Sequence, residues 1–296
     1  MSEKPAWSHA YPRLASIGLL LIAMISVQGG AALAKQLLPI VGAAGTAALR
    51  LAFATVMLLI VARPWRRLPR RDAAVAILAY GFSMGVMNLL FYSALSRIPL
   101  GITVALEFTG PLAVALAGSR RALDLAWVAF AVLGLALLLP LRSSARSLDP
   151  VGVAFALGAG FCWALYIVFG RRAGALYPDG AAALGVSAGA ALIVPIGAFT
   201  AGRSLLSTAL WPIAAAVALL SSAVPYSLEM FALTRLPART FGVLMSGEPV
   251  VAALVGLRFL DERLRPTQWL AILCIMLATG GSASTAAPDL ARIATD

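Results

Sequence analysis

Ten apolar runs, each close to the length of a membrane-spanning helix, follow one another along this chain and constrain its fold more than any other feature. A helix needs roughly 17 to 25 apolar residues to cross the hydrocarbon core of a bilayer. Hydrophobic residues make up 61% of the 296 residues and charged residues only 12%. We therefore expect an all-α, polytopic membrane protein with ten transmembrane helices. The runs fall at approximately 14–34, 44–62, 73–95, 101–118, 125–141, 151–170, 181–201, 209–233, 239–257 and 267–285.

The segments outside these runs are short, so we expect one membrane domain with brief tails at 1–13 and 286–296. The first run also has features of a cleaved signal peptide, because Lys4 and Arg13 precede an apolar stretch that ends in Ala-Leu-Ala at 32–34. Cleavage would leave nine helices and disrupt the internal repeat described below. We therefore expect the segment to be retained as the first helix.

The formal net charge of +11 is concentrated in the short loops between the apolar runs. A basic protein is a candidate for nucleic-acid binding, but this distribution is typical of the positive-inside rule for membrane proteins. The densest cluster is RPWRRLPRRD at 63–72. Placing that loop in the cytoplasm also places both termini there. We expect the lipid bilayer, and no nucleic acid, as a partner.

An internal repeat relates the two halves of the chain. The segments 94–118 and 232–256 align without a gap, and nine of their 25 positions are identical. The offset of 138 residues spans five helices, an odd number, so the second half enters the membrane from the opposite side. Such inverted repeats are common in secondary transporters, which bind substrate near the membrane midplane. We expect five-helix repeats at 14–141 and 142–285.

Three glutamates lie inside apolar runs, where a carboxylate costs about 2.5–3.5 kcal/mol at the bilayer centre. Glu107 and Glu248 are expected near the midplane, and Glu229 closer to the cytoplasmic end of its helix. Such groups face a cavity or a partner. They bind a substrate or a proton, or else form a buried ion pair or a hydrogen bond as the protonated acid.

Arg50 is the one basic residue expected within a spanning helix, and two prolines mark kinks. Arg50 either holds a substrate carboxylate through two hydrogen bonds or neutralises a glutamate permanently. Pro111 and Pro249 occupy equivalent repeat positions, and each leaves the carbonyl four residues earlier without its helical donor. We expect a kink at matched depth in both halves. A kink there lines a cavity or only adjusts packing.

Other polar and aromatic side chains at membrane depth are weaker candidates for a binding site, because each can equally form an interhelical hydrogen bond or packing contact. Gln28 and Asn88 rank first, since an amide has several hydrogen-bonding groups to satisfy. A GxxxG pair at 81 and 85 predicts close helix packing. The remaining candidates are Tyr92, Trp163, Tyr166 and Tyr226.

Several activities are excluded by the residues present. The one histidine, His9, lies in the N-terminal tail, which excludes a histidine proton relay or a histidine-ligated metal site. Cys162 and Cys274 lie in apolar runs without metal-like spacing, and we expect them to pack. No HExxH motif and no Ser/His/Asp set are present, so we expect neither an enzyme nor a cofactor. A channel would not need inverted repeats.

The residues together resemble the bacterial threonine/homoserine exporters, an EamA-type family of the drug/metabolite transporter superfamily. The resemblance spans about 14–285 and is strongest in SVQGGAALAK (26–35), ALEFTGPLAVAL (105–116), ALGAGFCWALYIVFGRRAGA (156–175) and PYSLEMFALTRLPARTFGVLMSGEP (225–249). Gly247 and Leu89 depart from the family pattern, which makes the pocket roomier or less polar if either position lines it. The family's polar membrane positions fall on Gln28, Arg50, Asn88, Glu107, Tyr226, Glu229 and Glu248.

The resemblance implies a multi-pass inner-membrane exporter of small neutral amino acids, driven by the proton gradient. We expect alternating access, with Glu107 binding the substrate ammonium, Arg50 its carboxylate, and proton entry releasing the substrate. Export of other metabolites or drugs on the same fold is the alternative.

Overall fold

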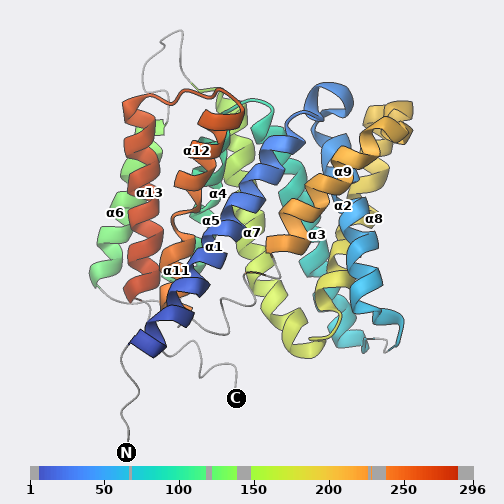
Figure 1. Ribbon diagram of the computed structural model, residues 1–296, viewed down its shortest axis with the longest axis horizontal. Helices are drawn as coiled ribbons and strands as arrows, with labels where there is room; N and C mark the ends of the chain where they lie inside the picture. Colours follow the sequence, from blue (N-terminus) through green and yellow to red (C-terminus); the bar gives the residue numbers. More distant parts are fainter. Residues whose placement is uncertain are drawn as a thin grey trace, which may run out of the picture.

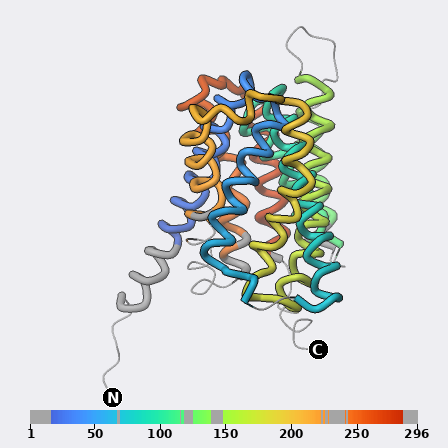
Figure 2. Tube along the Cα trace, turned by 90° about the vertical axis from the view of Figure 1, so that its right-hand side faces the viewer, coloured from blue at the N-terminus to red at the C-terminus, as the bar shows by residue number. Residues whose placement is uncertain are grey.

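The computed structural model describes residues 7–66, 69–117, 122–138, 148–225, 228 and 238–285, and regular structure within these ranges is entirely helical. The helices form one bundle and run alternately in opposite directions (Figure 1). Seen after a 90° rotation, they still run side by side along one axis (Figure 2). The α-helices are α1 (Trp7–Ala34), α2 (Leu38–Ala62), α3 (Arg71–Leu95), α4 (Leu100–Glu107), α5 (Thr109–Ala117), α6 (Ala122–Leu138), α7 (Pro150–Leu176), α8 (Ala181–Ala201), α9 (Trp211–Ala218), α11 (Ala238–Met245), α12 (Glu248–Phe259) and α13 (Pro266–Thr285).

Shorter helical turns complete the described structure. A π-helix, η4, continues α9 over Leu219–Ala223. Single 3-10 turns occur at Pro64–Arg66, Gly202–Leu206 and Thr208–Leu210. Within the described ranges, successive helices are therefore joined by short turns.

Within the described residues, each of the ten predicted apolar runs falls on helical structure, although not always on a single long helix. Of the described helices, six are long and apolar enough to cross a membrane: α1, α2, α3, α7, α8 with its 3-10 extension, and α13. The other four runs fall on the shorter α6, on α9 with η4, and on two broken helices, α4/α5 and α11/α12. The all-helical membrane architecture is thus confirmed.

The two broken helices are interrupted at equivalent places. α4 ends at Glu107 and α11 at Met245, which are 138 residues apart, the offset of the sequence repeat. Pro111 and Pro249 follow the breaks in the first turns of α5 and α12. A hydroxyl beside each break bonds to its own preceding turn, Thr109 Oγ1 to the Leu106 carbonyl and Ser246 Oγ to the Val243 carbonyl, both at 2.6 Å.

Helices of the first half pack mainly on helices of the second. α3 lies against α7 and α8, α2 lies against α8, and α6 lies against α13. α1 packs across α9, η4 and α12. The core is therefore built between the halves, and a cavity at its centre receives side chains from both.

Glycines bring α3 and α8 into direct backbone contact. Gly81 and Gly85 of α3 face Gly185 and Gly189 of α8, and a methyl group at Gly189 would lie 2.8 Å from the Gly81 carbonyl oxygen. This contact explains the GxxxG pair, since only small residues allow helix backbones to approach so closely.

Gly81→Ala is expected to destabilise the protein by about 1–3 kcal/mol, because the new methyl group would collide with the Gly185 carbonyl and Ala188. Gly18→Ala in α1 is the control, since a methyl there meets no atom within 4 Å. Thermal unfolding in detergent measures both. Equal unfolding temperatures for the two variants would contradict the packing described.

Candidate functional site

A cavity of about 300 Å³ lies between the two halves of the bundle. Its lining comes from α1, α2, α3, α4, α7 and α8, and from η4 and both parts of the broken helix α11/α12. The cavity is therefore bounded by the irregular segments of the fold, the two helix breaks and the π-helix. Backbone that departs from the α-helix is tolerated at membrane depth where it lines such a cavity.

Three ionisable side chains meet in this cavity. Glu107 and Glu248 are 7% and 6% exposed, and Arg50 is half-buried. The Glu107 carboxyl lies within electrostatic range of both Glu248 and Arg50. Two acids and one base thus share one apolar-walled space, an arrangement able to bind a molecule that carries both an ammonium and a carboxylate group.

Arg50 is held in place by neutral oxygen atoms. Its Nη1 donates to Asn88 Oδ1 at 2.5 Å, and its Nη2 donates to the Ser221 carbonyl at 3.3 Å. Asn88 is itself fixed by a 2.9 Å hydrogen bond from its Nδ2 to the Met84 carbonyl. The guanidinium also lies 6.0 Å from the ring centre of the buried Tyr92. These contacts hold the guanidinium at the wall of the cavity.

The Ser221 carbonyl is presented by the π-helix. In a π-turn the backbone bonds are displaced from the α-helical ladder, a feature found frequently at functional sites. Ser26 Oγ of α1 donates to the neighbouring Leu220 carbonyl at 2.8 Å, and a methyl group at Gly30 would collide with Ser221 Oγ. η4 is therefore seated closely against α1.

Glu248 and Glu107 occupy opposite helix ends. Glu248 is the first residue of α12, where the helix dipole favours a negative charge, and it accepts a 2.7 Å hydrogen bond from Gln28 Nε2. Glu107 is the last residue of α4, where the carbonyl ends of the helix add partial negative charge. The Glu107 end of the cavity is consequently the more attractive one for a cation.

Aromatic rings close part of the cavity wall. Phe108, at the helix break, meets Trp163 of α7 edge to face with ring centres 4.9 Å apart. Tyr166 packs against Tyr80 at the same distance, and Phe91 adds a further ring to the lining. Such rings provide a rigid apolar wall beside the charged groups.

The structure brings most of the predicted site residues together. Tyr92 lies behind Arg50 and is fully buried, and its hydroxyl has no hydrogen-bond partner among the described residues. Tyr226 and Glu229 lie outside the described residues. The predicted residues that line the cavity are Gln28, Arg50, Asn88, Glu107, Trp163, Tyr166 and Glu248.

Two lining serines, Ser221 and Ser222, were not predicted. The only sequence signal was a serine pair in an apolar run, shortly before Pro225. Gly247 and Leu89, which depart from the family pattern, are not among the residues that line the cavity. Among the residues that the structure describes, no three His, Cys, Asp or Glu side chains gather as a metal site.

Asn88→Leu is expected to lower the free energy of unfolding by about 1–3 kcal/mol, because the Arg50 guanidinium loses a buried acceptor. Ser83→Ala is the matched control on the same helix, since Ser83 Oγ bonds only to the Ala79 carbonyl of its own turn. Denaturation in detergent compares the two. If the Ser83 variant were as unstable as the Asn88 variant, the hydrogen bond from Arg50 to Asn88 would contribute no specific stability.

Comparison with known proteins identifies a family profile and several relatives that match this chain. The sequence profile of the EamA-like transporter family matches residues 150–283, which cover α7 to α13. The chain is 54% identical over 269 residues to the threonine/homoserine exporter RhtA of Escherichia coli strain K12, covering 91% of each chain. It is 52% identical over 281 residues to RhtA of Salmonella typhimurium strain LT2, covering 95% of each.

A solved crystal structure shares the fold with a TM-score of 0.58 at 19% identity, covering 95% of this chain and 99% of that one. The relatives are membrane exporters and not enzymes, which confirms the predicted class and the resemblance drawn from the sequence. The chain is thus a multi-pass membrane protein and belongs to the EamA-like transporter family.

Proposed function

We propose that the protein is a secondary active exporter of small neutral amino acids, threonine and homoserine among them, that works by alternating access and exchanges substrate for protons. The observation that carries the proposal is the cavity between two broken helices, where Glu107 and Arg50 face the same space. The names of the relatives, threonine/homoserine exporters, supply the substrate class.

Alternating access requires two halves that can rock against each other, and the packing supports an inverted repeat of 14–141 and 142–285. The 138-residue offset carries Leu100–Glu107, the bounds of α4, onto Ala238–Met245, the bounds of α11. The family profile starts at residue 150, where α7 begins the second half. Each half thus contains one helix broken at the same position.

The pairing of helices supports the same symmetry. Under the repeat, α1 corresponds to α7, α2 to α8, and α3 to α9 with η4. The contact of α3 with α7 then has its counterpart in the contact of α9 and η4 with α1, and α3 with α8 corresponds to α9 with α2. The equivalent helices α2 and α8, like α6 and α13, lie against each other. This pattern is expected of a two-fold axis in the membrane plane.

An amino-acid zwitterion fits the charges of the cavity. Its ammonium group is attracted to Glu107, where a carboxyl and the carbonyl end of α4 coincide. Its carboxylate is attracted to the Arg50 guanidinium, which Asn88 and the Ser221 carbonyl orient. Glu248 is already stabilised by the hydrogen bond from Gln28 and by the start of α12. We therefore expect Glu248 to keep these contacts while substrate and proton exchange at Glu107.

Protons enter the cycle at Glu107. The carboxyl binds either a proton or the substrate ammonium, so that arrival of a proton releases the substrate. We further propose that both termini lie in the cytoplasm and that the chain is located in the bacterial inner membrane. α1 begins and α13 ends at the same end of the bundle, as this orientation requires (Figure 1).

Efflux from reconstituted vesicles tests the function. Vesicles loaded with threonine, homoserine, or a panel of other amino acids and cationic drugs are given an imposed pH gradient. Threonine and homoserine are expected to leave at least tenfold faster than from protein-free vesicles when the pH gradient is imposed. Export of drugs but not of amino acids would favour the alternative substrate class, and chemical conversion of a solute would reject transport.

Glu107→Gln is expected to abolish the stimulation of efflux by the pH gradient, because an amide at this position neither takes up a proton nor attracts an ammonium group. Glu248→Gln is the comparison and is expected to slow efflux while keeping its dependence on the gradient. Vesicle efflux with and without the gradient measures both. Unchanged proton-dependent efflux in Glu107→Gln would remove this residue from the role.

A further inference from the structure

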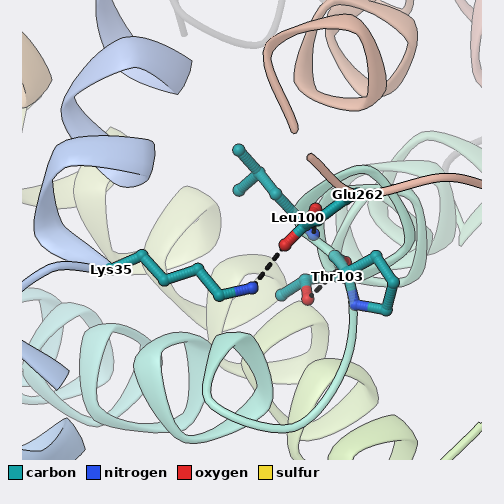
Figure 3. A network of polar contacts seen from close by, with 5 residues as sticks. Lys35, Leu100, Thr103 and Glu262 are labelled. Carbon is teal, nitrogen blue, oxygen red and sulfur yellow. Dashed lines mark hydrogen bonds and ion pairs between the residues drawn. The ribbon is translucent and has the colours of Figure 1, made fainter. Parts of the chain in front are cut away.

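Outside the cavity lining, at the end of the bundle opposite the start of α1, the carboxylate of Glu262 joins three parts of the chain. It forms an ion pair with Lys35 Nζ, just beyond the end of α1 (Figure 3). Its second oxygen accepts a 2.7 Å hydrogen bond from the backbone N–H of Leu100, the first residue of α4. Glu262 itself lies in the connection between α12 and α13.

The contact around Glu262 is closely packed. A methyl group at Gly256 of α12 would lie 2.6 Å from Glu262 Oε2, and the Glu262 N–H donates to the Gly256 carbonyl at 3.1 Å. A methyl at Gly101 of α4 would likewise lie 2.6 Å from Ala253 of α12. The side chains of Lys35 and Glu262 are only 30% and 10% exposed. This pair is therefore partly shielded from solvent, more so than an ordinary surface ion pair.

The helices that Glu262 joins lead directly to the acidic residues of the cavity. α4 runs from Leu100, at the Glu262 contact, to Glu107, and α12 runs back from Glu248 to the same contact. Each is a short rigid element with a break at its cavity end. α4 and α12 also pack against each other, so a movement at Glu262 is transmitted to both half-helices and toward both carboxyls.

We propose that Glu262 is a positioning residue that latches this end of the transporter shut and holds α4 and α12 in the geometry of the cavity. Opening of this end breaks the ion pair to Lys35 and releases both half-helices together. The Leu100 hydrogen bond supplies the free N–H at the start of α4 with an acceptor, so the carboxylate also fixes where α4 begins. The assignment deepens the proposed alternating-access function and rests on it.

Cysteine labelling of the intact protein in membranes tests the latch without requiring a known substrate. Cys162 and Cys274 are replaced by Ala, and Ser222→Cys places a reporter in the cavity lining. A membrane-impermeant maleimide is applied from either side. Arg263→Cys, at a position whose side chain is 83% exposed and adjoins Glu262, shows separately which side of the membrane the latch faces.

Glu262→Gln is expected to raise the labelling rate of the cavity cysteine from the latch side about tenfold and to lower it from the opposite side, because a charge-assisted contact of the closed state is lost. Lys35→Met, which keeps the acceptor for Leu100, is expected to give a smaller change in the same direction. Asp261→Asn is the matched control, since Asp261 is 87% exposed in the same loop and its backbone φ of 53° suits asparagine.

Equal labelling of Glu262→Gln and Asp261→Asn from the latch side would overturn the proposal. Thermal unfolding of each variant separates a change in accessibility from misfolding, and Lys35→Met supplies the answer if Glu262→Gln does not fold. The labelling result and the efflux result can fail independently of each other. A shift in labelling without any amino-acid efflux would keep the latch and reject the substrate, whereas efflux without a shift would do the reverse.

Discussion

The hydrocarbon core of a bilayer offers no water, so every backbone N–H and C=O at membrane depth has to bond within the protein. This constraint explains why regular structure in the described ranges is wholly helical and where the helices are allowed to stop. The breaks after Glu107 and Met245 and the π-helix at Leu219–Ala223 all border one cavity. At these three places the irregular backbone thus lies beside a cavity and not against lipid alone.

The same constraint decides how charge is arranged. Glu248 lies at the favourable end of a helix and has an amide donor, whereas Glu107 lies at the unfavourable end of another. Arg50 is oriented by an amide and a carbonyl oxygen. The two acids of the cavity therefore differ in their surroundings, and the proposed exchange of substrate and proton at Glu107 rests on that difference.

Sequence reasoning found the ten helical segments because apolar length is a strong signal, and it found Glu107, Arg50 and Asn88 because polar groups at that depth are costly. The proline pair at 111 and 249 indicated both interrupted helices. Ser221 escaped detection, because a serine in an apolar run normally bonds to its own turn and nothing in the residues marks a π-helix. The pairing of α3 with α7 depends on tertiary packing and has no local signal. The contact from Glu262 to Leu100 likewise joins residues 162 positions apart.

The glycine contact between α3 and α8 has a consequence for motion. The backbones of Gly81 and Gly85 lie directly against those of Gly185 and Gly189, and the Tyr80 ring occupies the space beside Gly185 where a side chain would stand. Backbone atoms block any closer approach, so this crossing has no room to compress. Relative movement of α3 and α8 is therefore confined to displacements that keep or enlarge the separation of their axes.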